Sequence, residues 1–434
     1  MFKHRKSPRS LPIEYFTGGE VASLIHDLRR KREKNHKDYT WVQYSDIEDA
    51  EGNQYVDLVQ EGGGVLGIAL LGYTYVLEEF GFRFLSLGGT SAGAINAVLL
   101  AAAGKPHEKR TRKLIPLLAN KNLFDFVDTE DKQLKAFFKN VLGEKKPNKL
   151  KMLWQLMFIF DNVLALKKTR GLNPGKAFER WMQEVLANCG VQNMQDLSDK
   201  MQPEPDTLYR RTAEGVKPIT KPITPKLAVI ATDLTTQTKA EFPAMADLYF
   251  KQPMQVNPAV FVRSSMSIPV FFEPYHLTGI PVDPKNQQKW IEKASFRGDI
   301  PKEVSFVDGG VVSNFPFDAF HRRGSVPRMP TFGVKLGIDR NKIFDTHKIG
   351  QLLNHTFAAA RQMNDFAFIQ KNREEYEHLV KNIDTDGFNW LNFNISNEKK
   401  RALFIKGAKE AADFIEDFHW STYKDLRGRQ LTKM

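Results

Sequence analysis

The chain has 434 residues, of which 41% are hydrophobic and 26% are charged, and this composition excludes a mainly disordered protein. Its 63 Lys and Arg against 51 Asp and Glu give a formal charge of +12, which suits anionic partners such as lipid headgroups or nucleic acid without choosing between them. A single cysteine, Cys189, excludes an internal disulfide. The length predicts one large domain with additions, or two domains.

The first part of the chain, residues 1–50, is polar and basic, and we expect an N-terminal arm that contains one short helix. Its basic start leads into no apolar core of the kind that a secretory signal needs. The longest apolar stretches, near 65–77, 92–103 and 152–166, are all shorter than the ~18 residues typical of a membrane span. We therefore expect a cytoplasmic protein whose contact with a membrane, if any, is peripheral.

A β-α-β unit is predicted next. Residues 54–59 have the composition of a strand, the glycine loop GGGVLG occupies 62–67, and an apolar helix over 65–80 ends at Gly81. A second hydrophobic strand is predicted over 82–87. The two strands should therefore be parallel neighbours in a buried sheet.

The glycine loop has the G-x-G-x-x-G spacing of a dinucleotide site. Such a site also needs an acidic residue about 20 residues further on, at the end of the second strand. That strand ends instead in Leu87, Gly88 and Gly89, whereas Glu78 and Glu79 precede it on the helix. The pattern therefore disfavours a nucleotide and favours a loop that directs backbone N–H groups at a developing negative charge.

The second strand is followed by GTSAG, a G-x-S-x-G motif between a strand and a helix. A sharp strand-to-helix turn exposes the hydroxyl of Ser91, and Gly89 and Gly93 let the neighbouring backbone pack closely. The helix N-terminus behind Ser91 also stabilises nearby negative charge. The motif therefore predicts a serine nucleophile.

A serine nucleophile needs a base. Several histidines follow Ser91 without a distinctive local setting, among them His276, His321, His347, His355, His378 and His419. Asp308 stands out more clearly, because it closes a short hydrophobic strand and is followed by Gly309 and Gly310. An ordinary Asp-Gly turn is the alternative interpretation of that segment.

Taken together, the glycine loop, GTSAG and DGG at 308–310 resemble, in order, the motifs of the patatin-like phospholipase family. Weaker similarity extends through GLNPGKAFERW at 171–181, KLAVIATDLTT at 226–236 and NPAVFVRSSMSIPVFFEPY at 257–275. The resemblance spans roughly residues 54 to 337 and implies a three-layer α/β/α hydrolase with a mainly parallel central sheet.

The resemblance also implies the roles of individual residues. Ser91 would be the nucleophile and Asp308 the base of a serine–aspartate dyad, with neither metal nor cofactor. The oxyanion hole would be formed by backbone groups of Gly62, Gly63, Gly64 and Ala92, with Gly67, Gly89, Gly93, Gly309 and Gly310 as the other motif glycines. Many family members carry Arg or Lys where this chain has Leu66. This departure puts full family-like activity in question.

The implied activity is phospholipase A type hydrolysis of acyl esters in phospholipids or related lipids. Acyl transfer to an acceptor other than water fits the same residues, and Leu66 with the basic surface leaves a catalytically silent lipid-binding protein as a further alternative. In the stretch 145–170, lysines bracket an apolar centre, which suggests an interfacial helix on an anionic membrane, with a core or lid helix as the alternative. The basic runs near 3–9 and 29–34 lack the interleaved aromatics of a base-stacking surface, so we expect no nucleic acid.

Three further segments complete the predicted organisation. The hydrolase domain, 51–340, should contain a helical insertion at about 105–200, and the proline-containing stretch 203–225 is expected to be a loop at an insertion boundary. Apolar residues at 3–4 spacing predict a helical section over 341–434. Its helices would pack on the hydrolase sheet or on a partner subunit, so an oligomer stays open.

Overall fold

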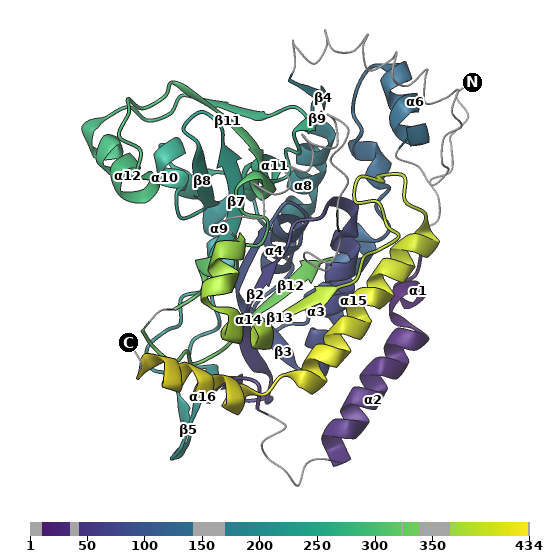
Figure 1. Cartoon of the computed structure of the whole chain (residues 1–434), viewed down its shortest axis with the longest axis vertical. Helices are drawn as coiled ribbons and strands as arrows, with labels where there is room; N and C mark the ends of the chain where they lie inside the picture. Colours follow the sequence, from purple (N-terminus) through teal and green to yellow (C-terminus); the bar gives the residue numbers. More distant parts are fainter. Residues whose placement is uncertain are drawn as a thin grey trace.

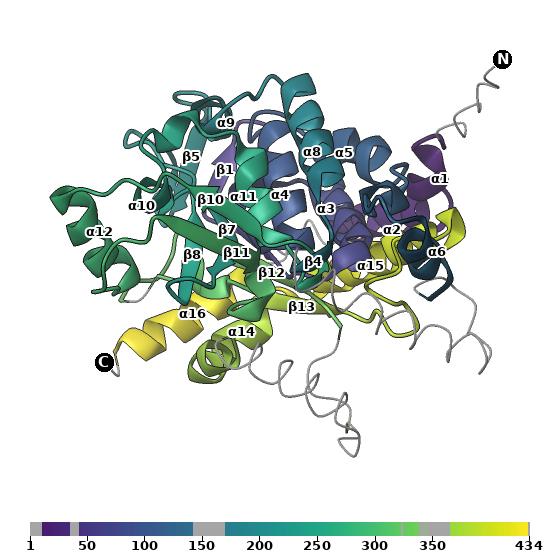
Figure 2. The same cartoon turned by 90° about the horizontal axis from the view of Figure 1, so that it is seen from above.

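In the computed structural model, helices cover both faces of a central β-sheet, which confirms the predicted three-layer α/β/α architecture. The structure describes residues 11–34, 43–141, 170–322, 324–337, 343 and 365–432. Figure 2 shows α3, α4 and α8 on one side of the sheet and α14 and α16 on the other. The predicted segment 145–170 lies outside the described residues except for Arg170.

The centre of the sheet is made of parallel strands, most of whose residues are buried. In spatial order, its parallel members are β7 (Leu227–Asp233), β3 (Phe82–Thr90), β2 (Gln54–Gln60), β12 (Thr331–Leu336) and β13 (Val380–Ile383). The antiparallel members beside β7 are β8 (Thr238–Phe242), β11 (Glu303–Asp308) and, beyond β11, β10 (Tyr275–Thr278). The sheet is therefore mainly parallel in its core, with an antiparallel edge.

The predicted β-α-β unit is confirmed. Strand β2 leads through the 3₁₀ turn η2 (Gly64–Gly67) into α3 (Ile68–Phe80), which stops at Gly81 with φ 121°, and β3 follows as a parallel neighbour of β2. Helix α4 (Ala92–Ala102) begins one residue after β3 and packs against β3 and β7. Both helices are buried on almost all sides, which explains why their apolar residues show no single stripe.

The helical insertion is present in the described residues, with one short strand in it. Its elements are α5 (Thr111–Leu118), η3 (Leu123–Phe126), α6 (Lys132–Val141), β4 (Gly171–Asn173), α8 (Lys176–Asn188) and α9 (Met194–Met201). The following part of the domain contains α10 (Ala246–Tyr249), η4 (Pro253–Gln255), α11 (Pro258–Ser265), β9 (Val270–Phe272) and α12 (Pro284–Ala294). Strand β9 pairs with β4, which ties the insertion to this part.

The prediction of a separate N-terminal arm is wrong for its described residues. Helices α1 (Glu14–Thr17) and α2 (Glu20–Lys34) pack on α15, and Figure 1 shows α2 and α15 side by side. The basic end of α2 is bound to the body of the protein, since Arg29 and Lys31 pair with Glu79 and Glu416. Strand β1 (Ile47–Asp49) pairs with β2, so no boundary falls at residue 50.

Two other predictions need correction. The stretch 203–225 is not a plain loop, because β5 (Leu208–Thr212) and β6 (Gly215–Pro218) form a hairpin that extends the sheet from β1. The C-terminal section is not only helical, because β13 joins the main sheet. Its described helices are α14 (Arg373–Leu379), α15 (Asn397–Asp417) and α16 (Trp420–Leu431).

The long helix α15 packs within the chain, in extended contact with α3. At their crossing, a Cβ on Gly72 would lie 2.8 Å from the carbonyl carbon of Phe404, and one on Gly407 would lie 2.7 Å from that of Ala69. Both positions therefore need glycine, because the two backbones touch there. Across the described ranges, no helix has both the length and the apolar character to cross a membrane.

Candidate active site

Ser91 lies in the sharp turn between β3 and α4. Its backbone is in a strained conformation, with φ 52° and ψ −116°, as expected for a strand-to-helix nucleophile turn. A Cβ on Gly89 would lie 2.6 Å from the carbonyl oxygen of Gly93, and one on Gly93 would lie 2.9 Å from that of Glu61. The two flanking glycines therefore allow the turn to fold onto itself and onto the end of β2.

The glycine loop lies directly beside Ser91. A Cβ on Gly62 would be 3.1 Å from the Ser91 Cβ and 3.0 Å from the Thr90 carbonyl oxygen, and one on Gly67 would be 2.9 Å from the Ala92 Cβ. The residues of the loop are thus placed against the nucleophile turn by steric fit, and any side chain at Gly62 would displace one of the two.

The donors of the loop fall into two groups. The N–H of Gly62 is donated to the Asn314 carbonyl oxygen (3.0 Å), so the prediction that Gly62 is an oxyanion donor is wrong, and its role is to provide clearance. The N–H of Val65 is likewise used, by the Trp390 carbonyl oxygen (3.0 Å). Within the described residues, the N–H groups of Gly63, Gly64 and Ala92 have no hydrogen-bond partner. These three remain the candidate oxyanion donors.

Leu66 is buried in the main hydrophobic core and contributes packing, not charge. A positive charge nevertheless lies close to the loop. The ammonium of Lys335, on β12, is buried 3.7 Å from the carboxylate of Glu61, the residue that precedes the three glycines. The chain therefore has a cation near its glycine loop, although this cation lies on strand β12 and not at position 66 of the loop.

Asp308 ends β11, and the 3₁₀ turn η5 (Gly309–Val311) begins directly after it. The backbone of Asp308 is fixed on both sides: its N–H donates to the Ser267 carbonyl oxygen (2.8 Å), and its carbonyl oxygen accepts from the Thr232 hydroxyl (3.0 Å). Its carboxylate Oδ1 accepts from the Gly310 N–H (2.7 Å). The side chain is buried and held in one orientation.

The segment that follows Asp308 is anchored on the residue before Ser91. A Cβ on Gly309 would lie 3.0 Å from the Thr90 Cγ2, and the Thr90 hydroxyl donates to the Ser313 carbonyl oxygen (2.9 Å). Strand pairing agrees, because β7 pairs Ile230 with Thr90 on one side and Ala231 with Asp308 on the other. The fold thus brings the serine turn and the aspartate turn to one end of the sheet.

Helix α11 and the turn after it connect the two predicted catalytic residues. The Ser265 hydroxyl accepts the Ser91 N–H (2.9 Å), and the Ser267 carbonyl oxygen accepts the Asp308 N–H. The sequence offered one signal for these residues, the RSSMS stretch within the weaker similarity at 257–275, but assigned them no role. No histidine hydrogen-bonds to Ser91 in the described residues, so nothing there completes a histidine triad.

A buried polar network behind the glycine loop was missed by sequence reasoning. Glu61 accepts hydrogen bonds from the Leu336 N–H (2.6 Å) and the Asn314 amide (3.1 Å). Asp365 accepts from the Ser313 hydroxyl (2.7 Å) and the Asn314 N–H (2.8 Å), and its burial raises the pKa of its carboxyl. The described residues contain no group of three metal-ligating side chains.

Comparison with known proteins agrees with this geometry. A family model described as "Patatin-like phospholipase" matches residues 58–321, which is more than half of the chain. The "Uncharacterized protein YqhO" of Bacillus subtilis (strain 168) is 28% identical over 373 residues, which cover 84% of this chain and 99% of that protein.

Two solved structures are more distant. The crystal structure of VipD from Legionella pneumophila has a TM-score of 0.39 and 17% identity, covering 86% of this chain and 70% of VipD. The ExoU-SpcU complex from the type III secretion system of Pseudomonas aeruginosa has a TM-score of 0.32 and 15% identity, covering 88% of this chain and 59% of the matched chain. Family membership rests on the family model and on its three motifs, which this fold places together. The chain belongs to the patatin-like phospholipase family.

Proposed function

We propose that the protein hydrolyses carboxylic esters of phospholipids, with Ser91 as nucleophile and Asp308 as base. One observation carries the proposal: the turn that holds Asp308 is hydrogen-bonded through Ser313 to Thr90, the residue next to Ser91. The glycine loop packs against the same serine turn, and its Gly63 and Gly64 N–H groups have no hydrogen-bond partner among the described residues. Nucleophile, base and oxyanion donors thus belong to one rigidly packed unit.

In the proposed reaction, the Ser91 Oγ attacks the ester carbonyl carbon while Asp308 takes the hydroxyl proton. The tetrahedral oxyanion is stabilised by the N–H groups of Gly63, Gly64 and Ala92. Collapse breaks the bond to the alcohol, which leaves as a lysolipid with the proton from Asp308. Water then attacks the acyl-enzyme and gives a proton to Asp308. Asp308 passes this proton to the Ser91 Oγ as the bond to the acyl carbon breaks, which releases the fatty acid and restores both residues.

An aspartate is a weak base near neutral pH, so its effectiveness depends on position. Asp308 is buried and fixed by bonds to its own N–H, carbonyl and carboxylate groups. A fixed, desolvated carboxylate loses little entropy when it accepts the serine proton. Each oxyanion donor contributes about 3–4 kcal/mol of transition-state stabilisation in enzymes of comparable design.

The test is a panel of phospholipids with different headgroups, incubated with the wild type, Ser91→Ala and Asp308→Asn and analysed by mass spectrometry. We expect fatty acid and lysolipid from the wild type only, with both variants retaining the wild-type melting temperature. Wild-type turnover by either variant would disprove the dyad.

Two further experiments distinguish hydrolysis from acyl transfer and from a catalytically silent lipid-binding protein. An added lysolipid acceptor distinguishes hydrolysis from acyl transfer, because transfer yields a new diacyl lipid in place of free fatty acid. A fluorophosphonate probe tests for a reactive serine directly, and we expect it to label the wild type and not Ser91→Ala. A wild type that binds liposomes but is not labelled would instead be a silent lipid-binding protein.

A further inference from the structure

A second site is indicated at the opposite end of the sheet from Ser91. A cavity of about 600 Å³ lies between β12, the segment that follows η6 (Phe317–Ala319), the loop after β6 and helix α16. Thr331, the first residue of β12, lines this cavity, whereas Leu336, the last, contacts the glycine loop. At about 3.3 Å per residue, the cavity lies roughly 16 Å along β12 from the catalytic end. It is too far away to hold the ester at Ser91.

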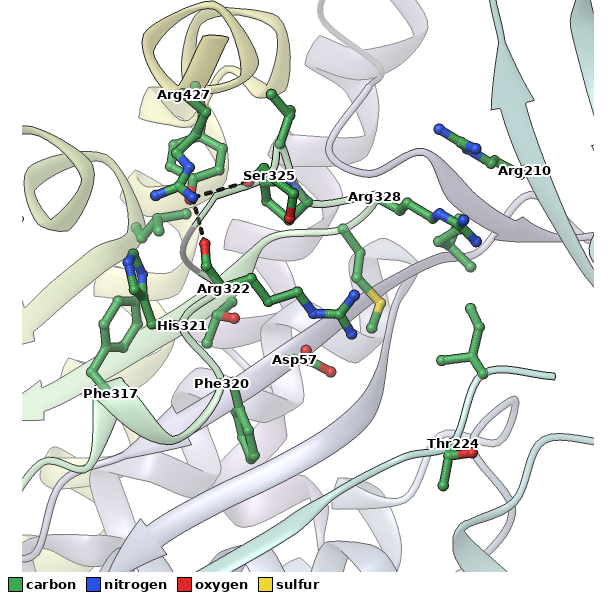
Figure 3. Close-up of a pocket in the computed structure, with 18 of the residues that line it drawn as sticks. Asp57, Arg210, Thr224, Phe317, Phe320, His321, Arg322, Ser325, Arg328 and Arg427 are labelled. Carbon is green, nitrogen blue, oxygen red and sulfur yellow. Dashed lines mark hydrogen bonds between the residues drawn. The ribbon is translucent and has the colours of Figure 1, made fainter. Parts of the chain in front are cut away.

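The lining of the cavity is strongly basic (Figure 3). Four separate segments contribute cationic side chains, and one carboxylate, that of Asp57 on β2, lies at its base. The cationic residues are Arg210, Lys221, Arg322, Arg328 and Arg427. The charge of Arg427 is balanced by Glu375, so four positive charges face the one carboxylate of Asp57, and an anion would stabilise this excess positive charge.

The five cationic side chains differ in the ion pairs and hydrogen bonds that they form within the protein. Arg427 is a structural residue: it forms an ion pair with Glu375 (2.5 Å) and donates to the carbonyl oxygens of Arg322 and Ser325, which fixes the loop that carries the other arginines. Burial raises the pKa of the Asp57 carboxyl. The guanidinium of Arg322, which Figure 3 shows directed toward Asp57, partly offsets this rise. Arg427 and Asp57 therefore organise the site.

The three remaining cationic side chains can bind a ligand. The side chains of Arg210, Lys221 and Arg328 are exposed and form no ion pair with any carboxylate in the described residues. Figure 3 shows Arg210 and Arg328 on the same side of the cavity, across from Arg427. Guanidinium groups donate paired hydrogen bonds that match phosphate oxygens, and the hydroxyl of Thr224 adds a neutral donor on the wall.

We propose that this basic pocket binds a phosphate-bearing anion, either a free small molecule or the headgroup of a lipid. Its volume exceeds that of a bare phosphate group and suits a small organic ligand. Buried aromatic side chains, Phe317 and Phe320, form part of its wall and would contact the uncharged portion. The proposal concerns a second site, so it does not depend on ester hydrolysis by Ser91.

The test measures binding with Arg328→Gln and Arg322→Gln. The matched control is Arg297→Gln, which removes an exposed arginine without an ion pair in the described residues and outside the pocket. The soluble arm titrates pyrophosphate by calorimetry. The membrane arm sediments the protein with phosphatidylcholine vesicles that contain or lack phosphatidic acid, using the Ser91→Ala background so that no lipid is consumed.

We expect each pocket variant to weaken binding about tenfold or more, as for a lost charge-assisted hydrogen bond, and the control to have little effect. If the pocket variants weaken only the binding of pyrophosphate, the ligand is a free phosphorylated molecule. If they weaken binding to vesicles with phosphatidic acid, and pyrophosphate competes with that binding, the ligand is a lipid headgroup. The melting temperature of free Arg328→Gln should equal or exceed that of the wild type, because a like-charge repulsion is removed. Equal weakening by Arg297→Gln, or no dependence on either pocket arginine in both arms, would overturn the proposal.

Discussion

The side-chain amide of Asn314 donates one hydrogen bond to the carboxylate of Glu61 (3.1 Å) and another to the carbonyl oxygen of Gly62 (3.0 Å). Glu61 and Gly62 lead into the glycine loop, and Asn314 lies a few residues after Asp308. One amide therefore fixes the distance between the proposed oxyanion donors and the proposed base. Because the same residue's N–H is held by Asp365, the network is anchored independently of both loops.

Replacing Asn314 should impair catalysis more than folding. In Asn314→Ala the backbone bonds to Gly62 and Asp365 remain, but the glycine loop loses its two side-chain bonds. Misplacement of catalytic groups by about 1 Å costs on the order of 100-fold in rate, so we expect kcat to fall by about 10- to 100-fold with a small change in KM.

The matched control for this variant is Asn193→Ala, which removes the side chain that caps α9 and forms its capping box. We expect that control to lose about 1 kcal/mol of stability and to keep its kcat, since α9 contributes none of the proposed catalytic residues. Steady-state kinetics and urea unfolding on both variants check this. An Asn314→Ala enzyme with wild-type kcat would show that the amide does not position the loop.

Gly62→Ala tests the close steric fit between the glycine loop, Asn314 and the Ser91 turn. The added methyl group would lie 2.6 Å from the Asn314 Oδ1 and 3.1 Å from the Ser91 Cβ, so the loop or the serine turn must move. We expect a loss of activity of at least 100-fold and a destabilisation of about 1–3 kcal/mol from overpacking. Gly428→Ala is the control, because α16 leaves open space around that position, and it should be neutral or slightly stabilising. Retained activity in Gly62→Ala would contradict the close fit.

The motifs could be placed from sequence because each depends on a local requirement. Ser91 needs a strand, a turn and a helix in succession, and Asp308 needs a strand end followed by glycines, and both patterns lie within a few residues. The network of Glu61, Lys335 and Asp365 could not be found in this way, because its members come from three distant segments and each looks like an ordinary charged residue in its own segment.

The donor assignment of Gly62 failed for a related reason. Whether its N–H is free depends on Asn314, which lies 252 residues away, and no local pattern reports that contact. The strand β13 was missed because its four residues lie between helical patterns and are only partly buried. The close contact of the two helix backbones at Gly72 and Gly407 could not be predicted either, because each glycine in its own segment indicates only a less stable helix.

Gly72 and Gly407 lead to a prediction in which stability changes and catalytic activity does not. Gly72→Ala and Gly407→Ala each place a methyl group against the backbone of the partner helix, which has no flexible side chain that can move aside. We expect a destabilisation of about 1–3 kcal/mol or more for each, with specific activity per folded molecule close to that of the wild type. Urea unfolding together with active-site titration separates the two quantities. A stable variant at either position would mean that α3 and α15 can separate at little cost.

The buried Lys400 on α15 predicts how stability depends on pH. Its ammonium donates to the carbonyl oxygens of Ala119 (3.0 Å) and Lys121 (2.6 Å), and burial lowers its pKa from 10.5 to about 8, partly offset by Asp125. Below pH 8 both folded and unfolded chains carry this proton, and the folded state bears the full cost of the buried charge. Between pH 8 and 10.5 the unfolded chain binds more protons, so this group's contribution to the free energy of unfolding rises with pH.

Comparison with Lys400→Met isolates this contribution, because the variant loses the titrating group and other alkaline effects cancel at each pH. From about pH 7 to about pH 9.5, we expect the wild type to gain about 2 kcal/mol of unfolding free energy relative to the variant, measured by urea denaturation. Loss of the two hydrogen bonds lowers the stability of the variant at both pH values and so does not change with pH. Lys409→Met removes an exposed lysine from the same helix and is the control for side-chain loss. A wild-type advantage that stays constant between the two pH values would mean that Lys400 remains charged in the fold, with its two carbonyl partners offsetting the burial.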